Sequence, residues 1–186
     1  MNAQDTDGPV DSLPDSPPHR NGPDGRPDSH FPSASTRQFK ALIVRPVVSA
    51  LGPGEGAVNL LTGTALVESG LAYLVQIRGP ALGLFQMEPA THDDCWQTWL
   101  RYQNATAASL LQVCGLSSPP GAGAMVSNLR YACAMARVKY LRAPPSLPDA
   151  SDAAGLSAYH KQHYNTPLGA ANATRNDALF QQAIDA

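Results

Sequence analysis

Glu68 is an acidic residue in a segment of otherwise apolar or small residues, and its chemistry is the most specific in the sequence. It lies near the end of the stretch TALVESGL, residues 64–71, and the chain contains only two other glutamates, Glu55 and Glu88. Burial disfavours the charged form of a carboxylate and raises its pKa. A carboxylic acid that stays protonated near neutral pH can donate a proton to a glycosidic oxygen. The alternative is a partly exposed glutamate that caps or solvates the end of its own helix.

The segment around Glu68 has the pattern of a helix. Leu61, Ala65 and Glu68 fall at positions i, i+4 and i+7 of residues 57–69 and therefore share one helix face. Gly70 offers a C-terminal stop, because glycine readily adopts the left-handed conformation. The pattern predicts Glu68 on the apolar face of a helix, at the point where that helix ends.

The rest of the chain predicts a mostly α domain of short helices. Further helices are predicted over residues 39–51, with Pro46 at the start of a second piece, from Pro89 onward, over 105–114, 124–142 and 151–164, and at Thr174, which with Asp177 resembles a capping pair. Residues 71–88 contain Gly79, Pro80 and Gly83 and predict a loop or short extended structure. The expected fold class is therefore mostly α with one irregular or β-like segment near residues 71–88.

Residues 1–36 differ in composition from the rest of the chain. They hold seven of the 17 prolines and six Asp against two Arg, which gives a charge of −4. Such a segment cannot bury enough surface to offset the entropy of ordering, so we expect a disordered tail. Residues 37–186 carry 11 basic and nine acidic residues, a charge of +2, and form the predicted domain. A domain so close to neutral lacks the dense basic patch of a nucleic-acid-binding protein.

The three cysteines and the absence of long apolar stretches bear on the compartment. Cys95, Cys114 and Cys133 are widely spaced and form no CxxC pair, which predicts free thiols in a reducing compartment. No basic segment followed by an apolar stretch marks a signal peptide. No window of about 18 apolar residues marks a membrane-spanning helix, so we expect no membrane insertion.

Two segments downstream of Glu68 complete an ordered set of motifs. The stretch GLFQMEPAT supplies Gly83, Leu84, Gln86, Met87, Pro89 and Thr91, and the stretch HYNT supplies Tyr164 and Asn165. With the Glu-Ser pair at the end of the predicted helix, they resemble the lytic transglycosylase and goose-type lysozyme group of the lysozyme-like superfamily. The sequence is most similar to small phage-encoded members. The resemblance covers residues 45–169, and its most specific part is residues 64–94.

This resemblance implies a lysozyme-like multi-helix fold over residues 37–186 and cleavage of the MurNAc-GlcNAc glycosidic bond of peptidoglycan. Glu68 would be the general acid and then the base, in a scheme that needs one carboxylate. In a transglycosylase the base activates the sugar's own C6 hydroxyl, which gives an anhydro product. The residues implied to bind substrate are Ser69, Gln86, Met87, Glu88, Tyr164 and Asn165. No cofactor and no metal is implied.

Other acids and histidines compete for a role. Asp93 and Asp94 could supply a second carboxylate that orients a water, or could occupy a helix N-terminus, where the helix dipole favours acids. His160 and His163 have i, i+3 spacing and could bind a metal with His92 or Asp93. No matching ligand cluster is visible, so surface or interface positions are expected for this pair of histidines.

Two functions of different classes follow from these observations. The first is a peptidoglycan-cleaving lytic transglycosylase or lysozyme acting on glycan strands. The second is a non-catalytic phage structural or assembly protein that retains a lysozyme-like scaffold and contacts other virion proteins, since a fold does not determine a function. Without a signal peptide, the expected location is the bacterial cytoplasm or a phage virion, with action on the cell wall after release or injection.

Overall fold

The structure is a computed structural model that describes residues 34–165 and 173–186. The helical elements are α1 (Ala34–Phe39), the π-helical turn η1 (Lys40–Val44), α2 (Arg45–Ala50), α3 (Glu55–Ser69), α4 (Pro89–Asp94), the π-helical turn η2 (Cys95–Trp99), the 3₁₀ turn η3 (Leu100–Tyr102), α5 (Asn104–Val113), α6 (Ala124–Ser127), α7 (Leu129–Leu141), α8 (Ala153–His163) and α9 (Ala173–Asp185). The mostly α class is confirmed. A lysozyme-like architecture stays a prediction.

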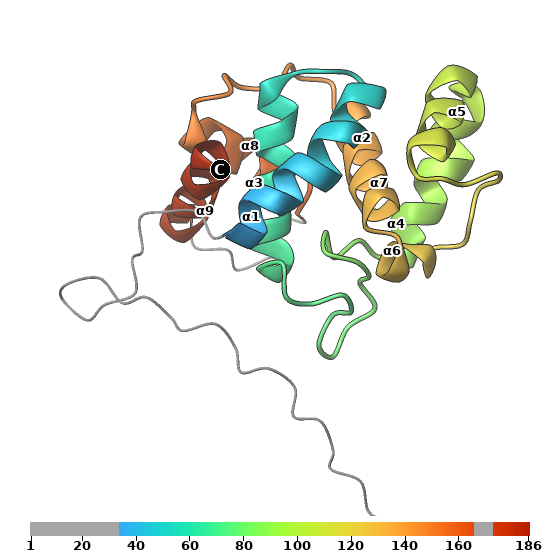
Figure 1. Cartoon of the computed structure of the whole chain (residues 1–186), viewed down its shortest axis with the longest axis horizontal. Helices are drawn as coiled ribbons and strands as arrows, with labels where there is room; N and C mark the ends of the chain where they lie inside the picture. The colour runs from blue at the N-terminus through green and yellow to red at the C-terminus, as the bar shows by residue number, and fades with distance from the viewer. Residues whose placement is uncertain (1–33, 166–172) are drawn as a thin grey trace, which may run out of the picture. The chain divides into compact units, whose positions relative to one another are not determined.

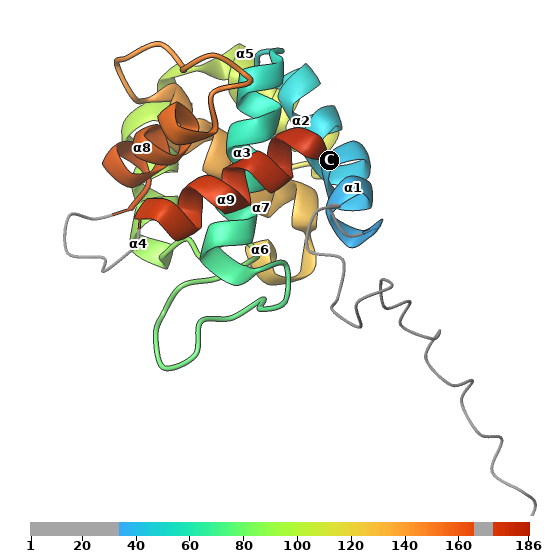
Figure 2. The same cartoon turned by 90° about the vertical axis from the view of Figure 1, so that its left-hand side faces the viewer.

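The segment between α3 and α4 is irregular. Its only β-type pairings in the described part are isolated bridges, Val75 with Leu82 and Leu82 with Met87. In Figures 1 and 2 this segment extends beyond the end of α3 as a long loop. The expectation of a loop or short extended structure over residues 71–88 agrees with this arrangement.

Helix α3 is the central element of the described domain. It packs against α9, α8 and α7. Figure 1 shows α3 in the middle of the helices, and Figure 2 shows α9 crossing over it. Every residue from Ala57 to Leu66 is buried, because apolar or small side chains occur on all faces of this helix. The polar residues among them bond within the fold, as when Thr64 Oγ1 donates to the Leu60 carbonyl at 2.8 Å.

Several boundaries differ from those expected. The predicted helix over residues 124–142 is interrupted at Asn128, whose side chain accepts a hydrogen bond from the Tyr131 N–H at 3.0 Å and so caps α7. An asparagine side chain competes in this way with backbone hydrogen bonding and favours a cap over a helix interior. Helix α1 begins at Ala34, so the last three residues of the predicted tail 1–36 are helical.

Further predictions concern Pro46, the N-terminal tail and the capping pair at Thr174. Pro46 lies in the first turn of α2, as predicted for a residue without an N–H. The predicted tail lies outside the described residues up to residue 33, and so does the side chain of Thr174. The disordered tail and the capping pair therefore stay predictions.

Two predictions concern the three cysteine thiols and the apolar character of the helices. Cys95, Cys114 and Cys133 are free and buried. Burial raises the pKa of the Cys114 thiol to about 11 and that of Cys133 further, so neither thiol ionises readily. Within residues 34–165 and 173–186, no helix has the length and apolar character needed to cross a bilayer.

Close packing of α3 on α9 generates a stability prediction. A Cβ at Gly63 would lie 2.2 Å from Cδ1 of Phe180, a buried ring of α9. Overpacking costs about 1–3 kcal/mol, and a contact this short belongs in the upper half of that range, above the ~1 kcal/mol by which Ala is a better helix former than Gly. We expect Gly63→Ala to lower the free energy of unfolding by about 1–2 kcal/mol in chemical denaturation.

Gly123→Ala is the matched control, because nothing lies within 4 Å of a Cβ at Gly123 and its φ is −56°. This change should stay within about 0.5 kcal/mol of the parent protein. A Gly63→Ala protein as stable as the parent would contradict the close contact between the two helices.

Candidate active site

Helix α3 ends within two residues of Glu68. The C-terminal stop is Gly70, which has a φ of 59° and whose N–H donates to the Leu66 carbonyl at 3.0 Å, as predicted. Glu68 lies in the last turn and has 19% of its side chain exposed. The carboxylate therefore reaches solvent at the point where the buried helix ends.

Ser69 joins the end of α3 to the following loop. Its side chain is buried, and Oγ donates to the Leu84 carbonyl at 2.7 Å and accepts from the Leu71 N–H at 3.2 Å. Ser69 therefore anchors the loop that follows α3.

A tight turn carries the second motif back toward Glu68. Leu82 and Met87 exchange both backbone hydrogen bonds, at 2.9 and 3.0 Å. Gly83 within this turn has a φ of 72°, and a Cβ there would lie 2.7 Å from the Met125 carbonyl oxygen. Positive φ and close backbone approach both require glycine, which is the physical reason for this residue of the motif.

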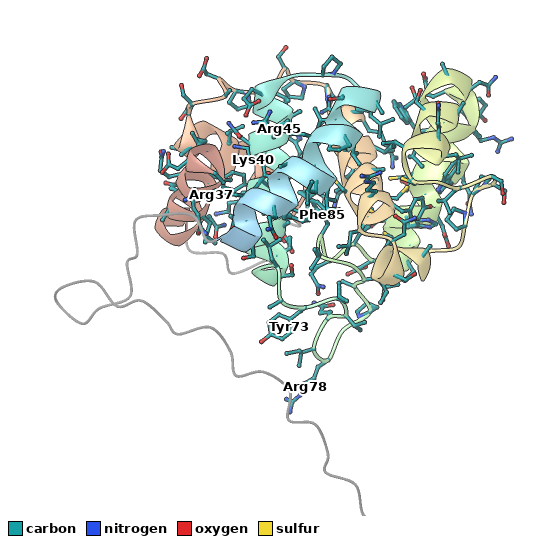
Figure 3. The ribbon with its side chains drawn as sticks, in the orientation of Figure 1. Arg37, Lys40, Arg45, Tyr73, Arg78 and Phe85 are labelled. Carbon is teal, nitrogen blue, oxygen red and sulfur yellow. The ribbon has the colours of Figure 1, made fainter. Side chains whose placement is uncertain are left out.

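The side-chain amide of Gln86 stabilises the turn by donating hydrogen bonds to backbone carbonyls. Its φ is 45°, unusual for a residue other than glycine, and its Nε2 donates to the Gly83 carbonyl at 2.8 Å and to the Tyr73 carbonyl at 3.3 Å. Its Oε1 accepts no hydrogen bond from the described residues and remains for a ligand. Figure 3 shows Tyr73 and Arg78 extending outward from the loop, with Phe85 among the helices.

These elements enclose a pocket of about 250 Å³. It is lined by Glu68, Gln76, Ala81, Gln86, Met87, Glu88, Thr91, Lys139, Tyr164 and Asn165. The residues implied by the resemblance thus meet at one place, with the exception of Ser69. They come from three segments that are far apart in the sequence.

The Glu68 carboxylate has one hydrogen-bond partner in the described part of the chain, His160 on α8. The distance from His160 Nε2 to Glu68 Oε1 is 2.9 Å. His160 is fully buried, with its ring stacked on Tyr164 at a centroid distance of 5.7 Å and tilted against Phe180 at 5.7 Å. The expected surface or interface position is therefore wrong for His160, because its face of α8 packs on α3 and α9.

Tyr164 is held in place by its own hydroxyl group. Its OH donates to the Phe85 carbonyl at 2.9 Å, and its ring lies 5.3 Å from that of Tyr140. Burial raises the pKa of Tyr164 well above its usual range, so the phenol stays neutral. Tyr164 thus lines the pocket and connects the loop to the end of α8. Its hydroxyl proton is used by the Phe85 carbonyl and is not free for a ligand.

Lys139 on α7 adds a positive charge to the pocket. Its Nζ donates to the Tyr164 carbonyl and lies 4.2 Å from the centroid of the Tyr164 ring. Burial lowers the pKa of Lys139, and the carboxylates of Glu68 and Glu88 act in the opposite direction. No carboxylate of the described chain lies within ion-pair distance of it.

Glu88 also changes the expected arrangement of acids. In the sequence no other acid lies near Glu68, but the loop brings exposed Glu88 to the same pocket. Asp93 and Asp94 do not line it. They lie in the second turn of the helical run that begins at Pro89, and not at its start, where the helix dipole would favour them.

Those two aspartates belong to a separate polar cluster. Asp94 pairs with Arg142 at 2.7 Å, and Asp93 Oδ1 lies 2.7 Å from His92 Nδ1. The other ring nitrogen of buried His92 lies 2.6 Å from the Tyr131 hydroxyl. These contacts account for the polar groups of the cluster without a ligand.

The metal-binding alternative lacks a ligand set in the described part of the chain. No three His, Cys, Asp or Glu side chains come together there in a way that could hold an ion. His163 packs its ring against Tyr159, at a centroid distance of 4.4 Å, while His160 contacts Glu68 instead. The two histidines therefore serve different contacts.

Sequence reasoning missed His160 and Lys139 as members of the site. A signal existed for His160, because it precedes Tyr164 by four residues and such residues share a helix face. A Tyr164 near Glu68 therefore implied His160 near Glu68. Lys139 had no comparable signal, since its position depends on how α7 crosses α8.

The bond between Ser69 and Leu84 generates a second stability prediction. Ser69→Ala leaves the buried Leu84 carbonyl without its donor, which costs about 1–2 kcal/mol. Thr98→Ala is the control, because the Thr98 hydroxyl also donates to a backbone carbonyl, that of Asp94, but at an exposed site. Thermal unfolding should show a lower midpoint for Ser69→Ala alone. Equal midpoints for the two variants would contradict the anchoring role.

The chain matches no protein-family model, no curated protein and no solved structure. The resemblance to the lysozyme-like superfamily rests on the sequence motifs alone and stays a prediction. The pocket around Glu68 is the structural feature on which a function can be proposed.

Proposed function

We propose that this protein cleaves the glycan strands of peptidoglycan, as a lytic transglycosylase or lysozyme, with Glu68 as general acid and base. One observation carries the proposal. Glu68 lines a single pocket with Gln86, Met87 and Glu88 from the loop and with Tyr164 and Asn165 from the end of α8. Residues that belong to separate sequence motifs, and that the resemblance assigns to one reaction, are thus neighbours in space.

The carboxyl group of Glu68 has the access that proton transfer requires. One oxygen, Oε1, faces His160, and the other has no hydrogen-bond partner in the described chain. The free oxygen would give its proton to the bridging oxygen between MurNAc and GlcNAc as the bond from that oxygen to C1 breaks. The resulting carboxylate would then remove a proton from the sugar's C6 hydroxyl, whose oxygen bonds to C1, or from a water in a lysozyme.

The other polar groups of the pocket suit a sugar with an acetamido group. The free Oε1 of Gln86 can accept a hydrogen bond from a sugar hydroxyl or an amide N–H. Lys139 supplies further donors, since two of its protons are not used by the Tyr164 carbonyl. Met87 and Ala81 contribute apolar surface next to these groups.

The second candidate is a non-catalytic phage structural or assembly protein that keeps this scaffold and contacts other virion proteins. The observation that favours it is the size of the pocket. Its volume of about 250 Å³ is smaller than the roughly 300–1,000 Å³ that is usual for ligand sites. A glycan chain would have to extend beyond the pocket along the surface.

Glu68→Gln tests the proposal directly. The amide has the same shape but cannot donate a proton as an acid, so release of soluble fragments from purified sacculi should fall by about 100- to 10,000-fold. Glu55→Gln is the matched control at the other end of α3, where Glu55 pairs with Arg45 at the surface, and it should retain activity. Circular dichroism of both variants checks that the helices are intact.

Further measurements separate the mechanisms. Mass spectrometry of the fragments should show anhydro-muramyl ends for a transglycosylase and reducing ends for a hydrolase. Glu88→Gln distinguishes one carboxylate from two, since only a two-carboxylate mechanism loses most of its rate with this change. If sacculi stay intact after incubation with folded parent protein, the enzyme proposal is refuted and the non-catalytic candidate is favoured.

A further inference from the structure

The contact between Glu68 and His160 leaves one nitrogen of the imidazole ring unused. Nε2 lies 2.9 Å from Glu68 Oε1, whereas Nδ1 is buried and has no hydrogen-bond partner in the described part of the chain. A histidine has three protonation forms, and each one treats these two nitrogens differently. The surroundings therefore discriminate between the forms.

Only one form avoids a buried N–H without an acceptor. A proton on Nδ1, whether in the neutral ring or in the imidazolium, would be an orphaned donor, which is rare and costly in proteins. The imidazolium would in addition place a charge at a residue with 0% exposure. The neutral ring with its proton on Nε2 instead donates to Glu68 Oε1 and leaves a lone pair at Nδ1.

We propose that His160 is a positioning residue that donates from Nε2 to Glu68 Oε1 and thereby keeps the transferable proton of Glu68 on Oε2. This inference rests on the proposed function of Glu68 as an acid. An oxygen that already accepts the Nε2 proton acts as the carbonyl oxygen of the protonated acid. The acidic proton is then on Oε2, the oxygen left for the substrate.

The same hydrogen bond assists proton release. When Oε2 gives its proton to the glycosidic oxygen, the negative charge spreads over both carboxylate oxygens. The bond from His160 Nε2 becomes charge-assisted and stronger at that moment. When the carboxylate later takes a proton from a C6 hydroxyl or a water, Oε2 receives it. His160 itself neither gains nor loses a proton.

The surrounding groups keep His160 in this role. Its ring is fixed between Tyr164 and Phe180. The titratable groups that face Glu68 are Lys139 and Tyr140 from α7, His160 and Tyr164 from α8, and Glu88 from the loop; α9 presents the apolar Phe180 to His160. Burial raises the pKa of Tyr140 and of Tyr164 well above the usual range, so neither phenol exchanges protons with Glu68 near neutral pH.

The first experiment reads the tautomer without reference to activity. Long-range ¹H–¹⁵N correlation of the full chain labelled at histidine, at neutral pH, assigns the protonated nitrogen of each ring. The signals of His160 are identified by their loss in His160→Leu. We expect a neutral ring with its proton on Nε2. A proton on Nδ1, or a charged ring, would overturn the proposal even if the protein cleaves glycan.

The second experiment uses variants that differ in the donor. His160→Gln can place an amide donor near the position of Nε2, whereas His160→Leu fills similar space without one. For His160→Leu we expect cleavage to fall about tenfold and the basic limb of the pH profile to move up by about one pH unit, because the ionised carboxylate loses its donor. His160→Gln should restore most of the rate and the parent pH profile.

His163→Leu is the matched control, since His163 lies on the same helix and contacts Tyr159 instead of Glu68. It should keep the parent pH profile. An unchanged profile in folded His160→Leu would overturn the positioning role while leaving Glu68 as the acid. Absence of cleavage in the parent protein removes the proposed function and the positioning role with it, and the tautomer measurement then still decides whether the hydrogen bond exists. If His160→Leu does not fold, the His160 signals are identified by their loss in His160→Gln, and the tautomer measurement decides the question.

Discussion

A carboxyl side chain can be placed on a helix that is buried on every face only where that helix ends or where the group has a hydrogen-bond partner. Helix α3 meets both conditions at Glu68. The helix stops at Gly70, and the carboxylate has His160 as its partner. The stop also sets the path of the chain, which must leave the core at this point as a loop.

That loop returns to the same carboxylate because its backbone is tied at several points. Ser69 bonds the Leu84 carbonyl, and the Leu82–Met87 pair closes a turn in which only glycine fits at position 83. The Gln86 side-chain amide donates to the Gly83 carbonyl within this turn and to the Tyr73 carbonyl of the preceding loop. The pocket is therefore preorganised, since the groups that shape it are held by the fold before any ligand arrives.

Some polar groups of the pocket are hydrogen-bonded within the protein, and others have no partner among the described residues. The Tyr164 hydroxyl and the Gln86 amide protons serve the fold. The free oxygen of Glu68, the Gln86 carbonyl oxygen and the remaining protons of Lys139 are left. These groups include an acid, an acceptor and a donor at one place, which is the set that a hydrogen-bonding ligand such as a sugar needs.

Local patterns were sufficient for much of the fold and for part of the site. The end of α3 at Gly70 and the start of α4 at Pro89 follow from backbone preferences of single residues, and these predictions are confirmed. The break at Asn128 was missed because periodicity alone does not show that a side chain will replace a backbone hydrogen bond. The error at His160 arose because a contact between helices decided the outcome. The error at Asp93 arose although the helix start was predicted, because Asp93 lies four residues after Pro89, in the second turn.

The sequence by itself determined that the chain is mostly helical, where α3 stops and that Glu68 lies at this stop. These properties depend on side-chain period and backbone conformation, which are local. Only the tertiary structure decided that His160 is buried against Glu68, that Lys139 and Glu88 share the pocket, and that Ser69 does not line it. Those contacts depend on how α3, α7, α8 and the loop cross one another, and crossing geometry is set by the packing of many side chains at once.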